Sequence, residues 1–207
     1  MRPEYDFSGG VRGKHAGKRL RIVGDASVGR ARTTVLRNGN TLVGTAGEYY
    51  VCAELCRLGY LALLTPKNNP LFDVVATNVD GTTSVSIQVK TRSARNKQGW
   101  KLNKKLSAVD TPGVPFVVLV NLNEQGPPDF LVYHYAEFAS RVREVFDKYM
   151  SRPKRTGEAH KDPGFRWFDE VNFTDADRGK LNNWEPIVSA LENNGSRSGH
   201  RTKKRGD

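Results

Sequence analysis

The stretch LFDVVATNVDGTTSVSIQVKTR, residues 71–92, predicts two strands joined by a tight turn. An apolar run covers residues 72–76, and residues 84–90 alternate strictly between polar and apolar side chains. Between them, Asp80 and Gly81 form a dipeptide that is typical of turns. The two strands are therefore expected to pair as a hairpin, with the apolar side chains of the second strand facing the core.

Two polar residues of the second strand, Gln88 and Lys90, share one face because successive side chains on a strand point to opposite sides. An ordinary half-buried strand would give that face to solvent. Asp73 favours another interpretation, since it interrupts the first apolar strand, where a charge is costly unless it is paired or bound to a cation. Pairing around the turn brings Asp73 near Gln88 and Lys90, so a carboxylate, an amide oxygen and an ammonium converge.

These residues have the chemistry of a metal site. Asp73 and Gln88 supply two hard oxygen donors of the kind that Mg²⁺ prefers, and the backbone carbonyl of Val89 is placed to supply a third. A lysine beside such a metal, here Lys90, can orient or deprotonate the water that attacks a phosphodiester. The hairpin therefore predicts a candidate site for phosphodiester hydrolysis.

The spacing D-x14-Q-x-K formed by Asp73, Gln88 and Lys90, with Pro70 just before it, resembles the PD-(D/E)XK nuclease superfamily. Within it, the pattern is similar to the branches that write the last element as Q-x-K. The resemblance implies a restriction-endonuclease-like α/β fold and an endonuclease that uses Mg²⁺ or Mn²⁺. Gln88 stands where most members have an acid, which removes one negative charge and lowers the expected metal affinity.

A helix is expected over residues 44–59, where Val51 and Leu55 recur at helical spacing and Gly59 ends the pattern. Glu48 then lies near the helix N-terminus, where the helix dipole tolerates an anion, so one interpretation is that it stabilises the first turn. In the Holliday-junction-resolvase-like and Mrr-like branches of the superfamily, a glutamate on this helix joins the metal site. The resemblance implies that Glu48 is a catalytic residue and a metal ligand.

The net charge of +11 is concentrated at the ends of the chain. Residues 1–41 hold nine basic residues against three acidic ones, and residues 195–207 hold five against one. Few large apolar side chains accompany the N-terminal charges, so residues 1–41 are expected to form a flexible basic arm, and residues 193–207 a disordered tail. The nuclease-like domain is expected to cover residues 42–192.

A second basic cluster follows directly on the proposed active strand, with no acidic residue among its members. Such clusters bind nucleic-acid phosphates because neutralising the phosphates releases counterions. Trp100 adds an aromatic ring to the cluster, and the alternative is an ordinary solvated loop. The expected nucleic-acid contacts are Arg92, Arg95, Lys97, Lys101, Lys104 and Lys105, with Arg152, Lys154 and Arg155 as a further set in a basic loop.

Further segments complete an α/β domain with a mixed central sheet of about five strands flanked by helices. A stripe of apolar and aromatic residues predicts that the helix after the last central strand packs on the sheet, with Arg141 toward solvent. The expected strands are 61–65, 114–122, 130–135 and, at an edge, 165–173, and the expected helices are 136–150 and 181–192.

Several classes of protein are disfavoured. Cys52 and Cys56 are four residues apart on one predicted helix and the four histidines are scattered, so zinc spacing is missing and buried, reduced thiols are expected. No apolar run approaches the length of a membrane span, and the N-terminus lacks the apolar stretch of a signal peptide. The expected location is the cytoplasm, without a membrane partner.

The preferred interpretation is a metal-dependent endonuclease acting on DNA, with RNA as the alternative substrate. Nucleases of the fold that the resemblance implies often pair to cut both strands, so a homodimer is left open. A different class is a nucleic-acid-binding module that keeps the fold and has lost cleavage, for which Gln88 is the best support. A third is a toxin–antitoxin component recognised through residues 1–41, because EYDFSGGVRGKHAGKR resembles short stretches of some antitoxins.

Overall fold

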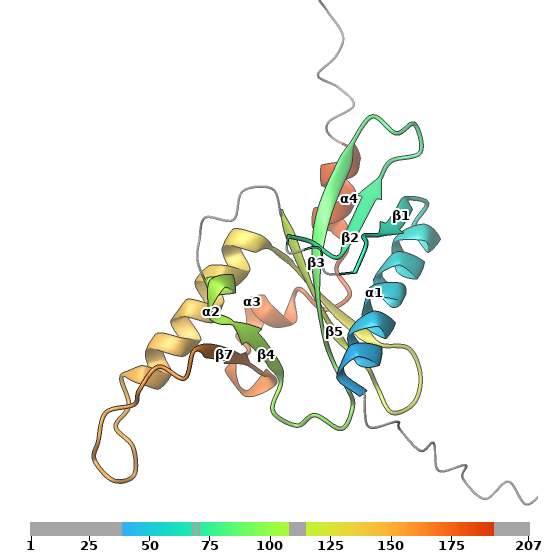
Figure 1. Ribbon diagram of the computed structural model, residues 1–207. Coiled ribbons are helices and arrows are strands. Elements are labelled where there is room, and N and C mark those ends of the chain that lie inside the picture. Colours follow the sequence, from blue (N-terminus) through green and yellow to red (C-terminus); the bar gives the residue numbers. More distant parts are fainter. Residues whose placement is uncertain (1–38, 68, 70, 108–114, 193–207) are drawn as a thin grey trace, which may run out of the picture. The chain divides into compact units, whose positions relative to one another are not determined.

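The computed structural model describes residues 39–67, 69, 71–107 and 115–192 (Figure 1). All of these residues belong to one compact unit. The predicted basic arm lies outside the described residues except for its last three, and the predicted tail lies outside them altogether. Among the described helices, none is both long enough and apolar enough to cross a membrane.

A five-stranded mixed sheet forms the centre, as the sequence predicts. Its order is β1-β2-β3-β5-β6, and the neighbours run antiparallel except for the parallel pair β3 and β5. A second sheet contains only β4 and β7. The strands are β1 (Leu61–Leu64), β2 (Val74–Thr77), β3 (Ser84–Arg92), β4 (Trp100–Asn103), β5 (Phe116–Asn121), β6 (Asp129–His134) and β7 (Phe165–Phe168).

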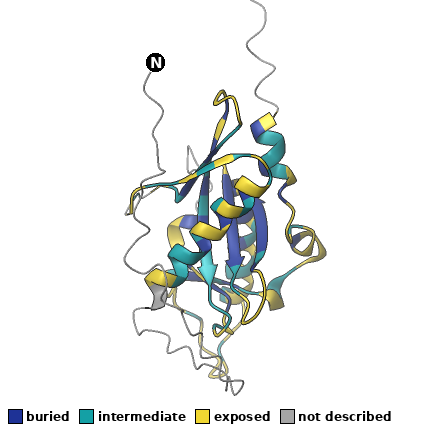
Figure 2. Ribbon diagram, turned by 90° about the vertical axis from the view of Figure 1, so that its right-hand side faces the viewer, coloured by how far each residue is buried: buried dark blue, intermediate teal, exposed yellow. Residues whose placement is uncertain are grey.

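Helices cover both faces of the central sheet (Figure 1). One face packs against the first and last helices, and the other packs against the second helix together with the β4–β7 sheet. The central strands are accordingly the most deeply buried part of the described chain (Figure 2). The helices are α1 (Gly39–Arg57), α2 (Tyr135–Met150), α3 (Asp175–Arg178) and α4 (Glu185–Glu192), with 3-10 turns η1 (Lys104–Ser107) and η2 (Glu170–Asn172).

Strand β5 connects the two hydrophobic clusters because it is buried on both faces. Val118 and its alternate neighbours pack with α1 and α4, whereas Val117 and Leu119 pack with α2 and the β4–β7 sheet. A strand that is apolar at every position is expected where both faces are covered. The continuous apolar run in the sequence thus reports a strand at the centre of the sheet.

The two-stranded sheet differs from the prediction for residues 165–173. The sequence predicts an edge strand there, but β7 is shorter and pairs with β4 in a separate sheet. The basic segment after β3, interpreted as a loop, contains β4. Trp100 starts that strand and is buried, and its indole N–H donates to the carbonyl oxygen of Val120 at 3.1 Å. Trp100 is therefore a core residue, and its ring gives no support to the interpretation of the basic cluster as a nucleic-acid site.

Three smaller expectations are also wrong. Cys52 is half-buried and burial raises the pKa of its thiol to about 11, but Cys56 is exposed. The predicted last helix begins at Glu185 instead of residue 181. Arg141 does not face solvent, because its guanidinium lies against the buried carboxylate of Asp177.

The carboxylate of Asp177 joins α3 to α2 and β6. It accepts hydrogen bonds from Arg141 Nη2 at 2.7 Å, from the Tyr133 hydroxyl at 3.1 Å, and from the backbone and side chain of Thr174 at 2.8 Å each. Burial raises the pKa of this carboxyl, but the hydrogen bonds from Arg141 and Thr174 outweigh it and hold the pKa below its ordinary value. The charge is therefore stable inside the fold only with its partners.

Candidate active site

The candidate site lies where the β2–β3 hairpin opens. Strand β2 begins at Val74, opposite Ile87, so β3 continues from Gln88 to Arg92 without β2 beside it. Asp73 precedes β2 and occupies this gap: its backbone N–H donates to the carbonyl oxygen of Ile87 at 3.0 Å. Its side-chain Oδ2 accepts the backbone N–H of Val89 at 2.7 Å, so the carboxylate takes the place of a strand partner.

The backbone of Asp73 is fixed from its other side by Thr65. The backbone N–H of Thr65 donates to the carbonyl oxygen of Asp73 at 3.0 Å, and its hydroxyl donates to the carbonyl oxygens of Phe72 and Asp73 at 2.9 and 3.2 Å. These bonds tie Asp73 to the segment that follows β1. The backbone of Asp73 is therefore held from both sides and its carboxylate by the Val89 N–H, which suits a preorganised site.

Lys90 completes the pair that the sequence predicts. Its Nζ lies 3.8 Å from Asp73 Oδ2 and donates to the carbonyl oxygen of Val89 at 3.1 Å. The side chains of Lys90 and Asp73 keep 29% and 25% of their exposure, so a solvent molecule or a phosphate has access to both. Of the three side chains predicted to converge, Asp73, Gln88 and Lys90, the structure thus brings Asp73 and Lys90 together.

Gln88 lies on the same face of the sheet as Lys90. Their parallel neighbours on β5 are Val117 and Leu119, which belong to the cluster around α2. The Gln88 side chain is half-buried and makes no side-chain hydrogen bond to another described residue. Gln88 therefore shares the Lys90 face, but within the described residues it forms no hydrogen bond with Asp73.

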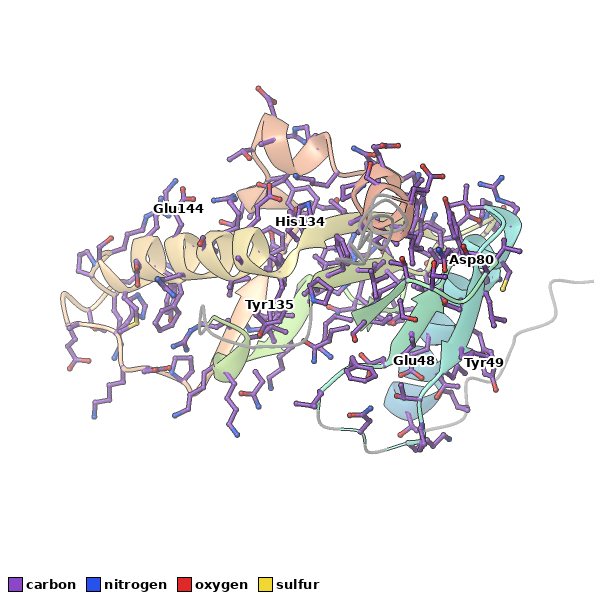
Figure 3. All side chains as sticks on the ribbon, turned by 90° about the horizontal axis from the view of Figure 1, so that it is seen from above. Glu48, Tyr49, Asp80, His134, Tyr135 and Glu144 are labelled. Atoms are coloured by element: carbon purple, nitrogen blue, oxygen red, sulfur yellow. The ribbon has the colours of Figure 1, made fainter. Side chains whose placement is uncertain are left out.

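Glu48 lies on α1 (Figure 3), and this helix packs along β1, β2 and β3. The helix begins at Gly39, so Glu48 lies in its middle and the predicted stabilisation by the helix N-terminus is wrong. Burial raises the pKa of the Glu48 carboxyl above its ordinary value of 4.5, and the charge of Asp73 raises it further, whereas Lys90 and Lys67 lower it. Glu48, Asp73 and Lys90 thus share one electrostatic environment.

Lys67 is a member of this environment that the sequence did not single out. It is an exposed residue in the segment between β1 and β2, and its charge acts on Glu48. Lys67 follows Thr65 and Pro66 and precedes Asp73 by six residues, and this closeness in sequence is the signal that could have identified it. Lys67 is thus the second positive charge, after Lys90, that acts on the Glu48 carboxyl.

The donor set fits a hard divalent cation. Glu48 and Asp73 offer carboxylate oxygens, Gln88 an amide oxygen and Val89 a backbone carbonyl, and all four are oxygen ligands of the type that Mg²⁺ and Mn²⁺ accept. Within the described part of the chain, no group of three or more histidine, cysteine, aspartate or glutamate residues is arranged for a metal. The site therefore holds two carboxylates and depends on neutral oxygens for the rest.

Replacing Glu48 by glutamine is expected to stabilise the fold at neutral pH and to weaken the site. The raised pKa means that the ionised carboxylate is penalised in the folded state once the pH exceeds its unfolded value, so the variant should melt at a higher temperature than the wild type at pH 7. The gain should vanish as the pH falls below the ordinary value of 4.5. Melting curves at pH 7 and pH 4 measure both effects.

Glu54 on the same helix is the matched control, because its hydrogen bond with Arg57 lowers the pKa of the carboxyl. Glu54→Gln should bring no gain in melting temperature at pH 7. Addition of Mg²⁺ should raise the melting temperature of the wild type more than that of Glu48→Gln. Equal melting temperatures for the wild type and Glu48→Gln at pH 7 would contradict the assignment of a penalised charge.

Gly47 permits the close approach of α1 to β3. A Cβ at this position would overlap Thr91 Oγ1 and lie 2.8 Å from Thr91 Cγ2. Gly47→Ala is expected to push α1 away from β3 and destabilise the fold by about 2 kcal/mol, and it should slow any reaction that needs Glu48. Gly44→Ala is the control in the same helix, since its Cβ would meet nothing within 4 Å, and it should stabilise the fold by about 0.5–1 kcal/mol.

Urea denaturation measures both glycine variants. The double variant Gly47→Ala with Thr91→Ala removes the two nearest Thr91 atoms, so it should regain part of the stability that Gly47→Ala loses. A strictly additive loss in the double variant would show that the contact between these residues is not the cause.

The expected phosphate-binding residues divide into two groups. Arg92 is already engaged: its guanidinium binds Asn121 and Glu170 and lies 4.2 Å from the ring centroid of Trp100, so it is not placed to meet a phosphate. Lys154 is half-buried and paired with Glu158 at 3.4 Å. The others are exposed, namely Arg95, Lys97, Lys101, Lys104, Lys105, Arg152 and Arg155.

Comparison with known proteins gives distant structural likenesses. One solved structure is a bacterial homing endonuclease, with 15% sequence identity, a TM-score of 0.44, and coverage of 76% of this chain and 97% of that one. Another is the Holliday junction resolvase of Archaeoglobus fulgidus, an archaeal hyperthermophile. Its sequence identity is 17% and its TM-score is 0.35, and the match covers 63% of this chain and 86% of that one. No family model and no curated protein matches the sequence. At these TM-scores the likenesses assign no family to the chain.

Proposed function

We propose that this protein hydrolyses phosphodiester bonds of DNA with the help of Mg²⁺ or Mn²⁺, at the open end of the β2–β3 hairpin. The observation that carries the proposal is the placement of Lys90 Nζ 3.8 Å from Asp73 Oδ2, with the carboxyl of Glu48 in the same electrostatic environment. The residues are those of the D-x14-Q-x-K pattern, so the sequence resemblance to PD-(D/E)XK nucleases and the geometry support the same site.

Each residue has a distinct role in the proposal. Asp73, Glu48, the Gln88 amide oxygen and the Val89 carbonyl would hold the cation, which supplies Lewis-acid stabilisation of charge on the scissile phosphate. Lys90 orients the attacking water and takes or shares its proton. Exposed cations that follow β3, such as Arg95 and Lys97, hold the phosphate backbone next to the site.

Cleavage of supercoiled plasmid and of branched DNA, with Mg²⁺, Mn²⁺ or a chelator, tests the proposal. Asp73→Asn should abolish cleavage and the calorimetric signal of metal binding, because it removes a carboxylate from a site that has only two. Asp80→Asn is the matched control, since Asp80 is an exposed carboxylate in the turn of the same hairpin (Figure 3). Cleavage that persists in Asp73→Asn, or that does not require metal, would contradict the proposal.

A second function, binding of nucleic acid without cleavage, is favoured by one observation. Asp73 accepts the Val89 N–H and Lys90 donates to the Val89 carbonyl oxygen, so two of the four potential metal ligands already have protein partners. A binding module should show DNA affinity that Asp73→Asn leaves unchanged, no cleavage of either substrate and no metal signal. The plasmid assay and calorimetry described above distinguish the two functions.

A further inference from the structure

A groove lies between the C-terminal half of α2 and strand β7, in the layer that covers the Gln88 and Lys90 face of the sheet. Its volume is about 510 Å³, which is within the usual range for ligand sites. We refer to it as the α2–β7 groove. The lining residues that matter here are Phe146, Lys148, Tyr149, Arg152, Phe165 and Trp167.

The aromatic rings of the α2–β7 groove are only partly covered by protein. The stripe on α2 was expected to be core, but the buried residues of this helix end at Val142. Beyond it Phe146 is half-buried and Tyr149 is 47% exposed, and Phe165 and Trp167 are half-buried. Aromatic side chains that fold into a layer and still face a groove are available to a ligand.

The rings are also held in fixed positions. Phe165 and Trp167 meet edge to face with centroids 6.0 Å apart, and the ring of Tyr149 lies 4.1 Å from that of His160. The guanidinium of Arg166 lies 3.4 Å from the ring centroid of Phe146 and binds Asp162 at 2.8 Å. A ligand that stacks on these rings finds them ordered before it arrives, which reduces the entropy cost of binding.

The charges at the α2–β7 groove favour an anion. Lys148 and Arg152 line it, are exposed, and form no ion pair with a described residue. Lys101 Nζ adds a positive charge 4.3 Å from the ring centroid of Phe165. Asp169 also lines the groove, but its Oδ1 already accepts the backbone N–H of Val171 at 2.8 Å. Aromatic faces beside free cations are the features that unpaired nucleotides require, because bases stack and phosphates pair with cations.

We propose that the α2–β7 groove binds an unpaired stretch of the nucleic acid, with bases stacked on Trp167 and Tyr149 and phosphates on Lys148 and Arg152. This inference rests on the proposed function, since the bound strand is a part of the substrate that the hairpin site cleaves. It specifies that substrate as DNA with a single-stranded or melted segment. A fully paired duplex hides its base faces and gains only the phosphate contacts.

Binding of the full chain to a labelled oligothymidylate of about 15 nucleotides, and to the corresponding blunt duplex, tests the inference in the presence of a chelator. Trp167→Ala and Tyr149→Ala should each weaken oligothymidylate binding about tenfold and leave the affinity for duplex unchanged. Tyr50→Ala is the matched control, because Tyr50 is 45% exposed on α1, close to the 47% of Tyr149, and it should alter neither affinity.

Tryptophan fluorescence gives a second measurement that does not depend on a drastic variant. Trp100 and Trp184 are buried, so quenching by oligothymidylate should come from Trp167 and should disappear in Trp167→Phe, which retains a stacking ring. Loss of oligothymidylate and duplex affinity in equal measure, or absence of quenching in the wild type, would overturn the inference. Displacement of the oligothymidylate by polyglutamate at equal concentration would also overturn it and point to an acidic peptide as the ligand.

Different experimental results would refute the nuclease function and the α2–β7 groove. Asp73→Asn should lose cleavage and retain oligothymidylate binding, because Asp73 does not line the α2–β7 groove. Absence of cleavage in the wild type, with quenching and the Trp167 effect intact, would refute the nuclease function while supporting the groove as a binding site. Cleavage with no preference for unpaired strands, together with no quenching, would refute the groove alone.

Discussion

Lys90→Ala is expected to lower the rate of plasmid cleavage by about 10³-fold, which is the usual contribution of a group that transfers or positions a proton in the transition state. The same variant should bind Mg²⁺ at least as tightly as the wild type. The ammonium of Lys90 lies 3.8 Å from Asp73 Oδ2 and repels a cation at that carboxylate, so its removal favours the metal. Rate under single-turnover conditions and calorimetric affinity measure the two effects.

Lys105→Ala serves as the control for Lys90→Ala. Lys105 is exposed in η1 and belongs to the same basic cluster, so its loss should weaken DNA binding slightly and reduce the salt dependence of binding by about one phosphate contact. A cleavage rate that falls equally in the two variants would assign Lys90 to phosphate binding. Weaker metal binding in Lys90→Ala would show that its charge supports the site in another way.

Asp177→Ala is expected to destabilise the fold by about 3–5 kcal/mol, because it leaves a partly buried guanidinium and a buried tyrosine hydroxyl without their acceptor. Asp177 is 1% exposed and the side chain of Arg141 is 15% exposed. The melting temperature should fall by roughly 10 °C. Urea denaturation and thermal unfolding both measure this loss.

Asp175→Ala is the matched control for this prediction. Asp175 is on the same short helix but fully exposed, and its contact with Arg178 is 3.8 Å long, so its loss should leave the unfolding midpoint unchanged. The depressed pKa of Asp177 also sets a pH window. Its stabilisation is complete above the ordinary value of 3.8 and should be lost as the pH falls below it, so the wild type and Asp177→Ala should converge in stability in acid.

The hairpin and its site were accessible to sequence reasoning because they depend on local rules. The alternation over β3, the turn at Gly81 and the placement of Asp73 one residue before β2 together determine the register. That register alone brings Asp73 to Val89 and Lys90. Glu48 was identified through a resemblance. The charges of Asp73 and Lys90 act on it, but its expected place at the start of the helix was wrong.

The errors fall where distant segments meet. Arg141 looks like a solvent-facing residue on its helix, and only Asp177, 36 residues later, makes it a buried partner. The sequence likewise places Trp100 in a basic loop, and only the pairing of β4 with β7 shows that it belongs to a strand. Contacts between residues far apart in the sequence have little effect on the local pattern of polar and apolar residues. The helix α1 begins at Gly39, before the predicted residue 44, for a different reason. Each residue that extends a helix adds one hydrogen bond, so even weak helix formers such as Asn40 adopt the helical conformation.

Alternate residues of β5 pack in different hydrophobic clusters, and this affects how the domain unfolds. Because Val117 and Val118 belong to opposite hydrophobic clusters, the loss of either layer exposes one apolar face of the central strand to water. The described domain should therefore unfold in one cooperative step, and amide hydrogens of α2 and of the hairpin should exchange through the same global event. A cation bound at Asp73 would then slow hydrogen exchange in α2, on the far side of the sheet from α1.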